Sequence, residues 1–314
     1  MSRVKERFYS FNNYLRGIFG TRVHRISLDA GLGCPNIDGT LSDEGCIYCN
    51  NKGFAAYART SKTLEEQIES SMRFYSQHLG AKKFIAYFQA FTNTYAQTPH
   101  LKKVYDTVKK FDEIVGVFIS TRPDCVDEDK IKLIAEYKKN YLVWIEYGLQ
   151  TTHDHILNSI NRNHTYKDFL AAVELTKRYE IQVGVHLIVG LPSATYQDMM
   201  DDALRIAKCG IQGVKFHVLH VLKDTQLEKV YRSGRLRLLT RAEYIKVLCD
   251  YLERLPSRCV VLRLISTAFG EYLVAPLWIN QKSKIIEEIS QELEKRGTHQ
   301  GYYCSYEGAR CQGQ

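Results

Sequence analysis

Apolar runs of six or seven residues alternate with amphipathic stretches along most of the chain. The runs lie at residues 23–28, 84–89, 114–120, 142–148, 183–189 and 214–219. Helices are predicted between them, at 63–80, 98–111, 128–139, 165–180 and 197–209, from helical spacing and capping residues. Strands that alternate with helices are typical of βαβ units, in which right-handed crossovers join parallel strands. The pattern therefore predicts an α/β fold, an incomplete parallel (β/α)6 TIM-like barrel.

The same alternation continues toward the carboxyl end without a Pro-, Gly- or Ser-rich linker. Thr240 and Glu243 predict the start of another helix, residues 259–265 are a candidate seventh strand, and residues 283–296 carry Ile and Leu at helical spacing. We therefore expect one domain in three parts. These are a basic amino-terminal segment (1–22), a core barrel (23–265) and a helical extension packed on the core (266–314).

The composition favours a soluble protein in a reducing compartment. Hydrophobic residues make up 45% of the 314 residues, which is ample for a packed core. The nine cysteines form no disulfide framework, and the start of the chain lacks the apolar core of a secretory signal. No apolar run approaches the roughly 18 residues that a membrane span needs. We therefore expect a cytoplasmic protein with no membrane partner.

Basic and aromatic residues are interleaved at the amino end, where much of the formal charge of +8 lies. The basic residues are Arg3, Lys5, Arg7, Arg16, Arg22, His24 and Arg25, and the aromatic ones are Phe8, Tyr9, Phe11, Tyr14 and Phe19. Basic side chains bind phosphates and aromatic rings stack on unpaired bases, so this segment is a candidate for RNA contact. An amphipathic lead-in packed against the barrel explains the same pattern.

Three cysteines follow the first predicted strand. Cys34, Cys46 and Cys49 are separated by eleven and then two residues. Three thiolates can hold three irons of a 4Fe-4S cluster and leave the fourth iron open. A Cys-x2-Cys pair is also half of many zinc sites, which His24 or another cysteine would complete. In parallel barrels ligands bind in the loops at the carboxyl ends of strands, and the triplet lies in such a loop.

Polar residues recur at the ends of several other predicted strands. Gln89 and Asn93 follow the second strand, and Glu146 and Gln150 close the fourth, while His186 lies within the fifth. Each has a plain structural explanation, such as a hydrogen bond to loop backbone. Their recurrence at one rim favours a polar site.

Several stretches of the chain resemble the radical S-adenosylmethionine (SAM) enzymes of the YhcC/YtqA type, which are relatives of the catalytic subunit of Elongator. Tyr48 stands before the last cysteine, as in the cluster motif of the superfamily, although the common first gap there is three residues and not eleven. The other matching stretches are residues 26–31, 87–95, 147–150, 161–165, 186–192 and 275–278.

The resemblance implies a six-stranded partial barrel, a 4Fe-4S cluster held by Cys34, Cys46 and Cys49, and SAM bound at the open iron. It also implies a reducing electron donor such as flavodoxin or ferredoxin. The cofactor-binding residues that it suggests are Tyr48, Gln89, Asn93, Glu146, Gln150, Arg162, His186 and Ile188. Among these, Tyr48 and Ile188 would contact the adenine, Glu146 or Gln150 the ribose, and Arg162 the methionyl carboxylate.

The barrel must also shield a radical from all but one substrate hydrogen. The apolar residues of the fifth strand, Val183, Val185, Leu187 and Val189, are expected to form interior walls that do so.

The substrate that the resemblance implies is tRNA. It implies conversion of a carboxymethylaminomethyl group on the wobble uridine to an aminomethyl group, with the amino-terminal segment and Arg232, Arg235, Arg237 and Arg241 as candidate tRNA contacts.

Two alternatives stay open. One is a radical SAM enzyme that acts on a small molecule or tetrapyrrole, because residues 219–225 also resemble oxygen-independent porphyrinogen oxidases. The other is a non-catalytic tRNA-binding protein with a zinc site. The amount of iron and sulfide in the purified protein separates the second from the cluster hypothesis.

Overall fold

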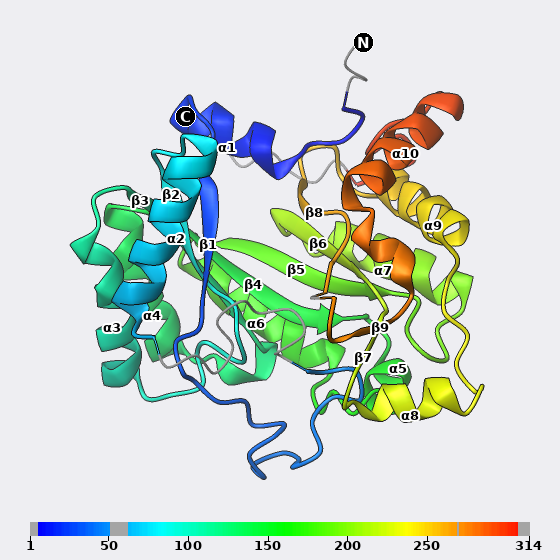
Figure 1. Cartoon of the computed structure of the whole chain (residues 1–314), viewed down its shortest axis with the longest axis horizontal. Helices are drawn as coiled ribbons and strands as arrows, with labels where there is room; N and C mark the ends of the chain where they lie inside the picture. Colours follow the sequence, from blue (N-terminus) through cyan, green and yellow to red (C-terminus); the bar gives the residue numbers. More distant parts are fainter. Residues whose placement is uncertain (1–5, 51–61, 269, 307–314) are drawn as a thin grey trace.

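A curled sheet of parallel strands forms the centre of the computed structural model, which describes residues 6–50, 62–268 and 270–306 (Figure 1). Seven strands pair in the order β1-β2-β3-β4-β5-β6-β8. They are β1 (His24–Leu28), β2 (Phe84–Phe88), β3 (Ile114–Thr121), β4 (Leu142–Gln150), β5 (Gln182–Val189), β6 (Gly213–Val218) and β8 (Val260–Arg263). The six predicted strands and the candidate seventh are confirmed, and the α/β fold is an incomplete barrel.

Helices cover the outer face of this sheet (Figure 1). They are α2 (Leu64–Leu79), α3 (Thr98–Asp106), α4 (Glu128–Glu136), α6 (Tyr166–Arg178), α7 (Tyr196–Lys208) and α9 (Arg241–Arg254), and α10 (Lys282–Lys295) packs on α9. Thr63, Thr165, Thr195 and Thr240 each begin a helix with a complete capping box, which satisfies backbone N–H groups that the helix itself cannot. The helices α3 and α4 end earlier than predicted because each continues as a short 3-10 turn, at Thr107–Lys110 and Tyr137–Lys139.

The sequence patterns did not predict several short elements. These are α5 (Asp154–Ser159), α8 (Gln226–Arg232) and the antiparallel pair β7 (Val221–Leu222) and β9 (Leu273–Ala275). Segments this short contain too few residues for a period to be recognised. None of the helices in the described ranges has both the length and the apolar character that crossing a membrane requires.

The amino-terminal segment forms α1 (Phe11–Phe19), which packs into the amino-terminal end of the half-barrel. The Phe11 ring meets Phe118 edge to face at 5.7 Å between centroids, and Tyr14 meets Trp144 at 5.5 Å. A backbone hydrogen bond from Val261 to Tyr9 ties the segment to β8. Two of the aromatic residues considered for RNA contact therefore serve packing, as the amphipathic lead-in hypothesis predicted. Arg3 and Lys5 lie outside the described residues.

Candidate active site

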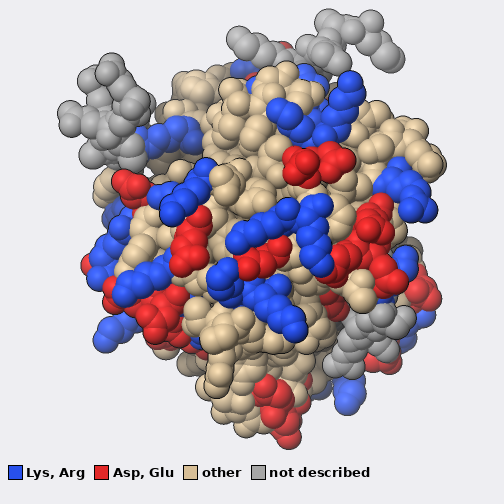
Figure 2. Space-filling view, turned by 90° about the vertical axis from the view of Figure 1, so that its left-hand side faces the viewer, with Lys and Arg blue, Asp and Glu red and all other residues tan. Residues whose placement is uncertain are grey.

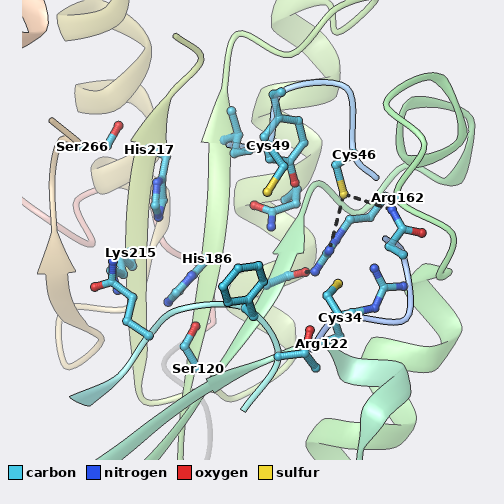
Figure 3. Close-up of a pocket in the computed structure, with 18 of the residues that line it drawn as sticks. Cys34, Cys46, Cys49, Ser120, Arg122, Arg162, His186, Lys215, His217 and Ser266 are labelled. Carbon is cyan, nitrogen blue, oxygen red and sulfur yellow. Dashed lines mark hydrogen bonds between the residues drawn. The ribbon is translucent and has the colours of Figure 1, made fainter. Parts of the chain in front are cut away.

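One pocket opens at the carboxyl ends of the strands (Figure 3). Loops after β1, β2, β3, β4 and β8 line it, together with side chains from within β5 and β6. Nine of the eleven predicted site residues are in its lining: Cys34, Cys46, Cys49, Tyr48, Gln89, Gln150, Arg162, His186 and Ile188. The carboxyl ends of the parallel strands thus bring together residues that are up to 154 positions apart in the sequence, from Cys34 to Ile188.

The loop that carries the cysteines is held against the segment that follows α5. The Asn36 side chain donates to the Asn161 carbonyl at 2.7 Å and accepts from the Asn163 side chain at 2.7 Å. The Asn161 side chain in turn donates to the Gly45 carbonyl at 2.6 Å. Residues of the long first gap between Cys34 and Cys46 are therefore anchored at both ends of the gap, which gives the eleven-residue spacing a defined shape.

Cys34, Cys46 and Cys49 form no disulfide within the part of the chain that the structure describes, and hydrogen-bond donors face Cys46. The Asn36 amide lies 3.4 Å and the Arg162 guanidinium 3.7 Å from the Cys46 Sγ (Figure 3). A second Arg162 nitrogen donates to the Gly148 carbonyl at 2.6 Å, which fixes the guanidinium beside the sulfur. Donors of this kind stabilise thiolates bound to iron. The three thiols and their donors are suited to holding a cluster.

Burial, followed by the neighbouring Cys46 and Cys34, raises the pKa of the Cys49 thiol to about 12. A bound metal reverses this, because a coordinating thiol is deprotonated by the charge of the ion. In the described ranges no three His, Cys, Asp or Glu side chains stand close enough to share a single ion. A 4Fe-4S cluster does not require that closeness, since each thiolate binds a different iron.

Asn93 and Glu146 do not reach the pocket surface, unlike the other predicted cofactor residues. The Asn93 amide is fully buried and donates to the carbonyls of Phe88, Ala90 and Ser120, so it holds the loop after β2. Glu146 is also fully buried and bonds to other side chains beneath the pocket. Both positions lie near strand ends, but their side chains are used by the protein itself.

The walls of the pocket come from the opposite face of β5 to the one expected. His186 and Ile188 line the pocket, whereas Val183, Val185, Leu187 and Val189 belong to the core beneath the outer helices. Alternate residues of a strand point to opposite faces of the sheet, so the residues that line the pocket and the residues that face the outer helices cannot be the same. The prediction of interior apolar walls from these four residues is wrong.

A group of charged and polar side chains lies at the base of the pocket. We call it the charged floor: Arg25, Tyr87, Glu146, His186, Lys215, His217 and Arg263. The Glu146 carboxylate accepts from Tyr87 at 2.9 Å, His186 at 2.6 Å and Lys215 at 2.9 Å, all on the same Oε2. The Lys215 ammonium also bonds to the Tyr87 hydroxyl. Gly184 makes room for this arrangement, since a Cβ there would lie 3.1 Å from the Glu146 Cγ.

Burial governs the protonation of the charged floor. Burial lowers the pKa of Lys215 to about 7 and the pKa of His186 to about 3, in both cases against the raising effect of Glu146. Burial and the Arg263 charge lower the pKa of His217 well below its usual value. The Glu146 pKa is well below its usual range: burial opposes this, but the cation of Lys215, the His186 hydrogen bond and Arg25 outweigh it. At neutral pH both histidines are neutral and Glu146 is charged.

The sequence patterns missed two of the cations in the lining, Lys215 and Arg263. Each is a charged residue within a short, otherwise apolar strand, at Val214-Lys215-Phe216 and Leu262-Arg263-Leu264. A charged residue is almost never fully buried without a partner. A charged residue between apolar neighbours in a short strand was therefore the sequence signal that could have identified Lys215 and Arg263 as site residues.

Comparison with known proteins places this pocket in a family. Residues 38–206 match the model of the Radical SAM superfamily, and residues 211–295 match the Radical_SAM C-terminal domain. YtqA of Bacillus subtilis is 36% identical over 304 residues, or 96% of this chain and 94% of YtqA. YhcC of Escherichia coli is 33% identical over 288 residues, or 91% of this chain and 92% of YhcC.

A solved structure agrees on the fold. The archaeal Methanocaldococcus infernus Elp3 with an N-terminal deletion superposes with a TM-score of 0.63 at 16% identity, over 88% of this chain and 64% of that one. Members of the matched superfamily use a 4Fe-4S cluster and SAM. The chain belongs to the radical SAM superfamily and, within it, to the YhcC/YtqA family related to Elongator.

Proposed function

We propose that this radical SAM enzyme modifies the wobble uridine of tRNA, converting a carboxymethylaminomethyl group to an aminomethyl group. The observation that carries the proposal is the pocket itself. It has three thiols at one end and the charged floor at its base. A cofactor and the polar carboxymethylaminomethyl group of a nucleobase can therefore share the pocket. A base that undergoes chemistry inside a pocket must first leave its stack, and a pocket at an open barrel mouth suits a flipped nucleotide.

The cofactor assignment follows from the lining. We assign Cys34, Cys46 and Cys49 as the cluster ligands, with Tyr48, Gln150, Arg162 and Ile188 as candidate contacts for SAM. When bound, the cluster and SAM supply a carbon radical that removes a hydrogen atom from a nearby C–H bond. The protein has to orient one such bond and exclude water. Tyr48 and Ile188, which pack with the apolar cluster around Leu157 and Leu191, are suited to excluding water.

The chemistry fits an amine that carries a carboxymethyl group. Loss of a hydrogen atom from the carbon between the nitrogen and the carboxylate leaves a radical on that carbon. Transfer of one further electron to the oxidised cluster would give an iminium, and water would then cleave its C–N bond, releasing the aminomethyl group and glyoxylate. The C–H bond that is broken first is the one that the pocket has to orient.

The names of more distant relatives support tRNA as the substrate class. Archaeosine synthase subunit beta of Methanosarcina acetivorans is 28% identical over 128 residues, or 40% of this chain. The tRNA-2-methylthio-N(6)-dimethylallyladenosine synthase of Sulfurihydrogenibium is 28% identical over 171 residues, or 51% of this chain. The second name specifies a tRNA-modifying enzyme, which favours a nucleoside in RNA as the substrate.

The basic stretch near α8 contributes unequally to such binding. Arg232 pairs with Glu228 at 2.7 Å, Arg237 pairs with Glu243, and both arginines are well exposed. Exposed pairs are worth little, so these arginines can exchange their partner for a phosphate. Arg241 is mostly buried and holds Glu288 on α10, which gives it a structural role. We retain Arg232, Arg235 and Arg237 as candidate tRNA contacts.

A second surface is less suited to RNA. Figure 2 shows the side of the molecule that lies at the left in Figure 1, where basic and acidic side chains are interspersed. Several of them form pairs within and between helices, including Lys110 with Glu65 and Lys132 with Glu128. A phosphate backbone prefers a continuous basic strip, so we place tRNA at the pocket mouth and not on this side.

The proposal is tested with tRNA as substrate. Protein reconstituted without oxygen is mixed with SAM, a reductant and tRNA that carries the carboxymethylaminomethyl group, and the nucleosides are separated by mass. We expect the aminomethyl nucleoside and 5′-deoxyadenosine to accumulate together. The matched control is Cys46→Ala, which should give neither. Formation of 5′-deoxyadenosine with no change in any tRNA nucleoside would direct the search to small-molecule substrates.

A further inference from the structure

The charged floor contains more positive than negative charge. Arg25, Lys215 and Arg263 are the basic side chains, with Lys215 cationic below its pKa of about 7. Glu146 is the carboxylate that they surround, and both histidines are neutral. The Lys215 and Glu146 side chains are 2% and 0% exposed. A buried charge without a partner is unfavourable, and one carboxylate cannot balance two or three cations. The charged floor therefore has the electrostatics of an anion site.

Some donors of the charged floor have no hydrogen-bond acceptor among the described residues. The Arg25 Nη1 and the Arg263 Nε are both buried without one, and the nearest carboxylate oxygen to the Arg25 Nη1 is the Glu146 Oε1 at 3.7 Å. The Arg263 Nη2 lies 2.6 Å from the Nε2 of His217, which is only a neutral acceptor. Lys215 uses two of its three N–H donors on Tyr87 and Glu146, so one is left for a ligand.

Lys215 and Arg263 face the pocket, whereas Arg25 and the carboxylate do not. Lys215, His217 and Arg263 line the pocket, together with the hydroxyl-bearing Ser120 and Ser266, but Glu146 does not. Figure 3 shows Lys215 and His217 on the opposite side of the pocket from Cys34 and Cys46. A ligand that enters the pocket thus meets cations on one side and the thiols on the other.

We propose that Lys215 and Arg263 bind a carboxylate of the substrate at the base of the pocket. The inference rests on the proposed function, in which the group to be removed ends in a carboxylate. Two cations from neighbouring strands can each bond one carboxylate oxygen, which is the arrangement that charge-assisted hydrogen bonds favour. Anchoring the carboxylate there fixes the adjoining methylene between the charged floor and the cysteine side, so Lys215 and Arg263 decide which C–H bond is presented.

The test compares two free nucleosides that differ only in the carboxylate. Reconstituted protein is titrated by calorimetry with 5-carboxymethylaminomethyluridine and with 5-methylaminomethyluridine, in the presence of S-adenosylhomocysteine. We expect the wild type to bind the carboxylated nucleoside about tenfold more tightly, because hydrogen bonds to charged groups are the strong ones. Lys215→Met and Arg263→Gln should each reduce this preference to less than about threefold.

Folding of the variants is controlled separately. Lys215→Met leaves Glu146 buried without its ammonium partner, so the double variant Glu146→Gln with Lys215→Met removes both charges and keeps the volume. Each variant is also assayed for SAM cleavage without substrate, which reports an intact cluster. A wild-type preference that is lost in a variant with normal SAM cleavage supports the carboxylate site.

An equal affinity of the wild type for both nucleosides, or a preference that survives in all three variants, overturns the carboxylate site. Failure of the proposed function would be recognised by a different result, namely the absence of tRNA conversion. A carboxylate preference without conversion would leave the anion site standing and reject the tRNA reaction. Conversion without a carboxylate preference would do the reverse.

Discussion

At the scale of single residues, the cysteine triplet makes the sharpest prediction. Cys46 is the most enclosed of the three thiols and receives both the Asn36 and the Arg162 donors. We expect Cys46→Ala to abolish reductive cleavage of SAM, because the cluster loses one of three ligands. The measurement is 5′-deoxyadenosine formed under reducing, oxygen-free conditions. Cys304→Ser is the matched control, since Cys304 lies outside the pocket and should leave the cleavage rate unchanged. Full cleavage by Cys46→Ala would reject the ligand assignment.

Lys215 makes a second prediction at this scale, which concerns pH. Its pKa is lowered to about 7, whereas the groups that face it keep their charge between pH 6 and 8. Tyr87 stays protonated because its pKa is raised, and His186 and His217 stay neutral because their pKa values are lowered. Glu146 stays ionised and Arg263 stays cationic. Lys215 is charged below its pKa and neutral above it, so carboxylate binding weakens as pH rises.

We expect the affinity ratio of the two nucleosides to fall up to about tenfold between pH 6 and pH 8. The ratio cancels the titration of the amine, which both nucleosides share. Lys215→Arg should hold the ratio constant over the same range, because a guanidinium keeps its proton. A ratio in the wild type that does not change with pH would show that Lys215 is not the group that senses the carboxylate.

At the scale of elements, the sequence predicted the order and type of strands and helices well but not the faces of the buried strands. Capping pairs such as Thr63 with Glu66 marked helix starts because they are local chemistry. The run 183–189 is apolar on both faces apart from Gly184 and His186, so it lacked the alternation that identifies an inner face. That ambiguity explains why the wrong face of β5 was predicted to line the pocket.

The same ambiguity explains why two of the predicted cofactor residues, Asn93 and Glu146, do not line the pocket. A strand-end position predicts that a residue is near the rim, but the direction of its side chain depends on pairing with distant strands. Glu146 points to Tyr87, His186 and Lys215, which come from three other strands. Only the folded sheet brings these partners together, so a local pattern could not distinguish a cofactor contact from a buried network.

The close contact between β6 and β4 gives a prediction for this scale. A Cβ on Gly213 would lie 2.7 Å from the Trp144 ring, which is fully buried. We expect Gly213→Ala to lower the free energy of unfolding by about 1–3 kcal/mol, because the ring must shift in a packed core. Urea denaturation measures the change. Gly17→Ala is the control with the opposite sign: Gly17 lies in α1 with open space around it, so alanine should stabilise by about 0.5–1 kcal/mol.

At the scale of the whole molecule, the fold and the cofactor site are built from separate parts. The main core lies between the strands and the outer helices, and α1 fills the amino-terminal end of the half-barrel. The cysteines lie in a loop at the other end, held by asparagine side chains and backbone hydrogen bonds. Removal of the metal therefore leaves the large hydrophobic clusters intact.

We expect the metal-free protein to keep its secondary structure and to unfold cooperatively. Cluster binding should raise the unfolding temperature, because a ligand that binds only the native state stabilises it by mass action. Circular dichroism and thermal unfolding of chelated and reconstituted protein, with about four iron and four sulfide per reconstituted chain, measure this. Cys46→Ala should behave like the chelated wild type under both conditions. A metal-free protein without secondary structure would mean that the cysteine loop nucleates the fold, as in small zinc domains, and that the cluster is structural as well as catalytic.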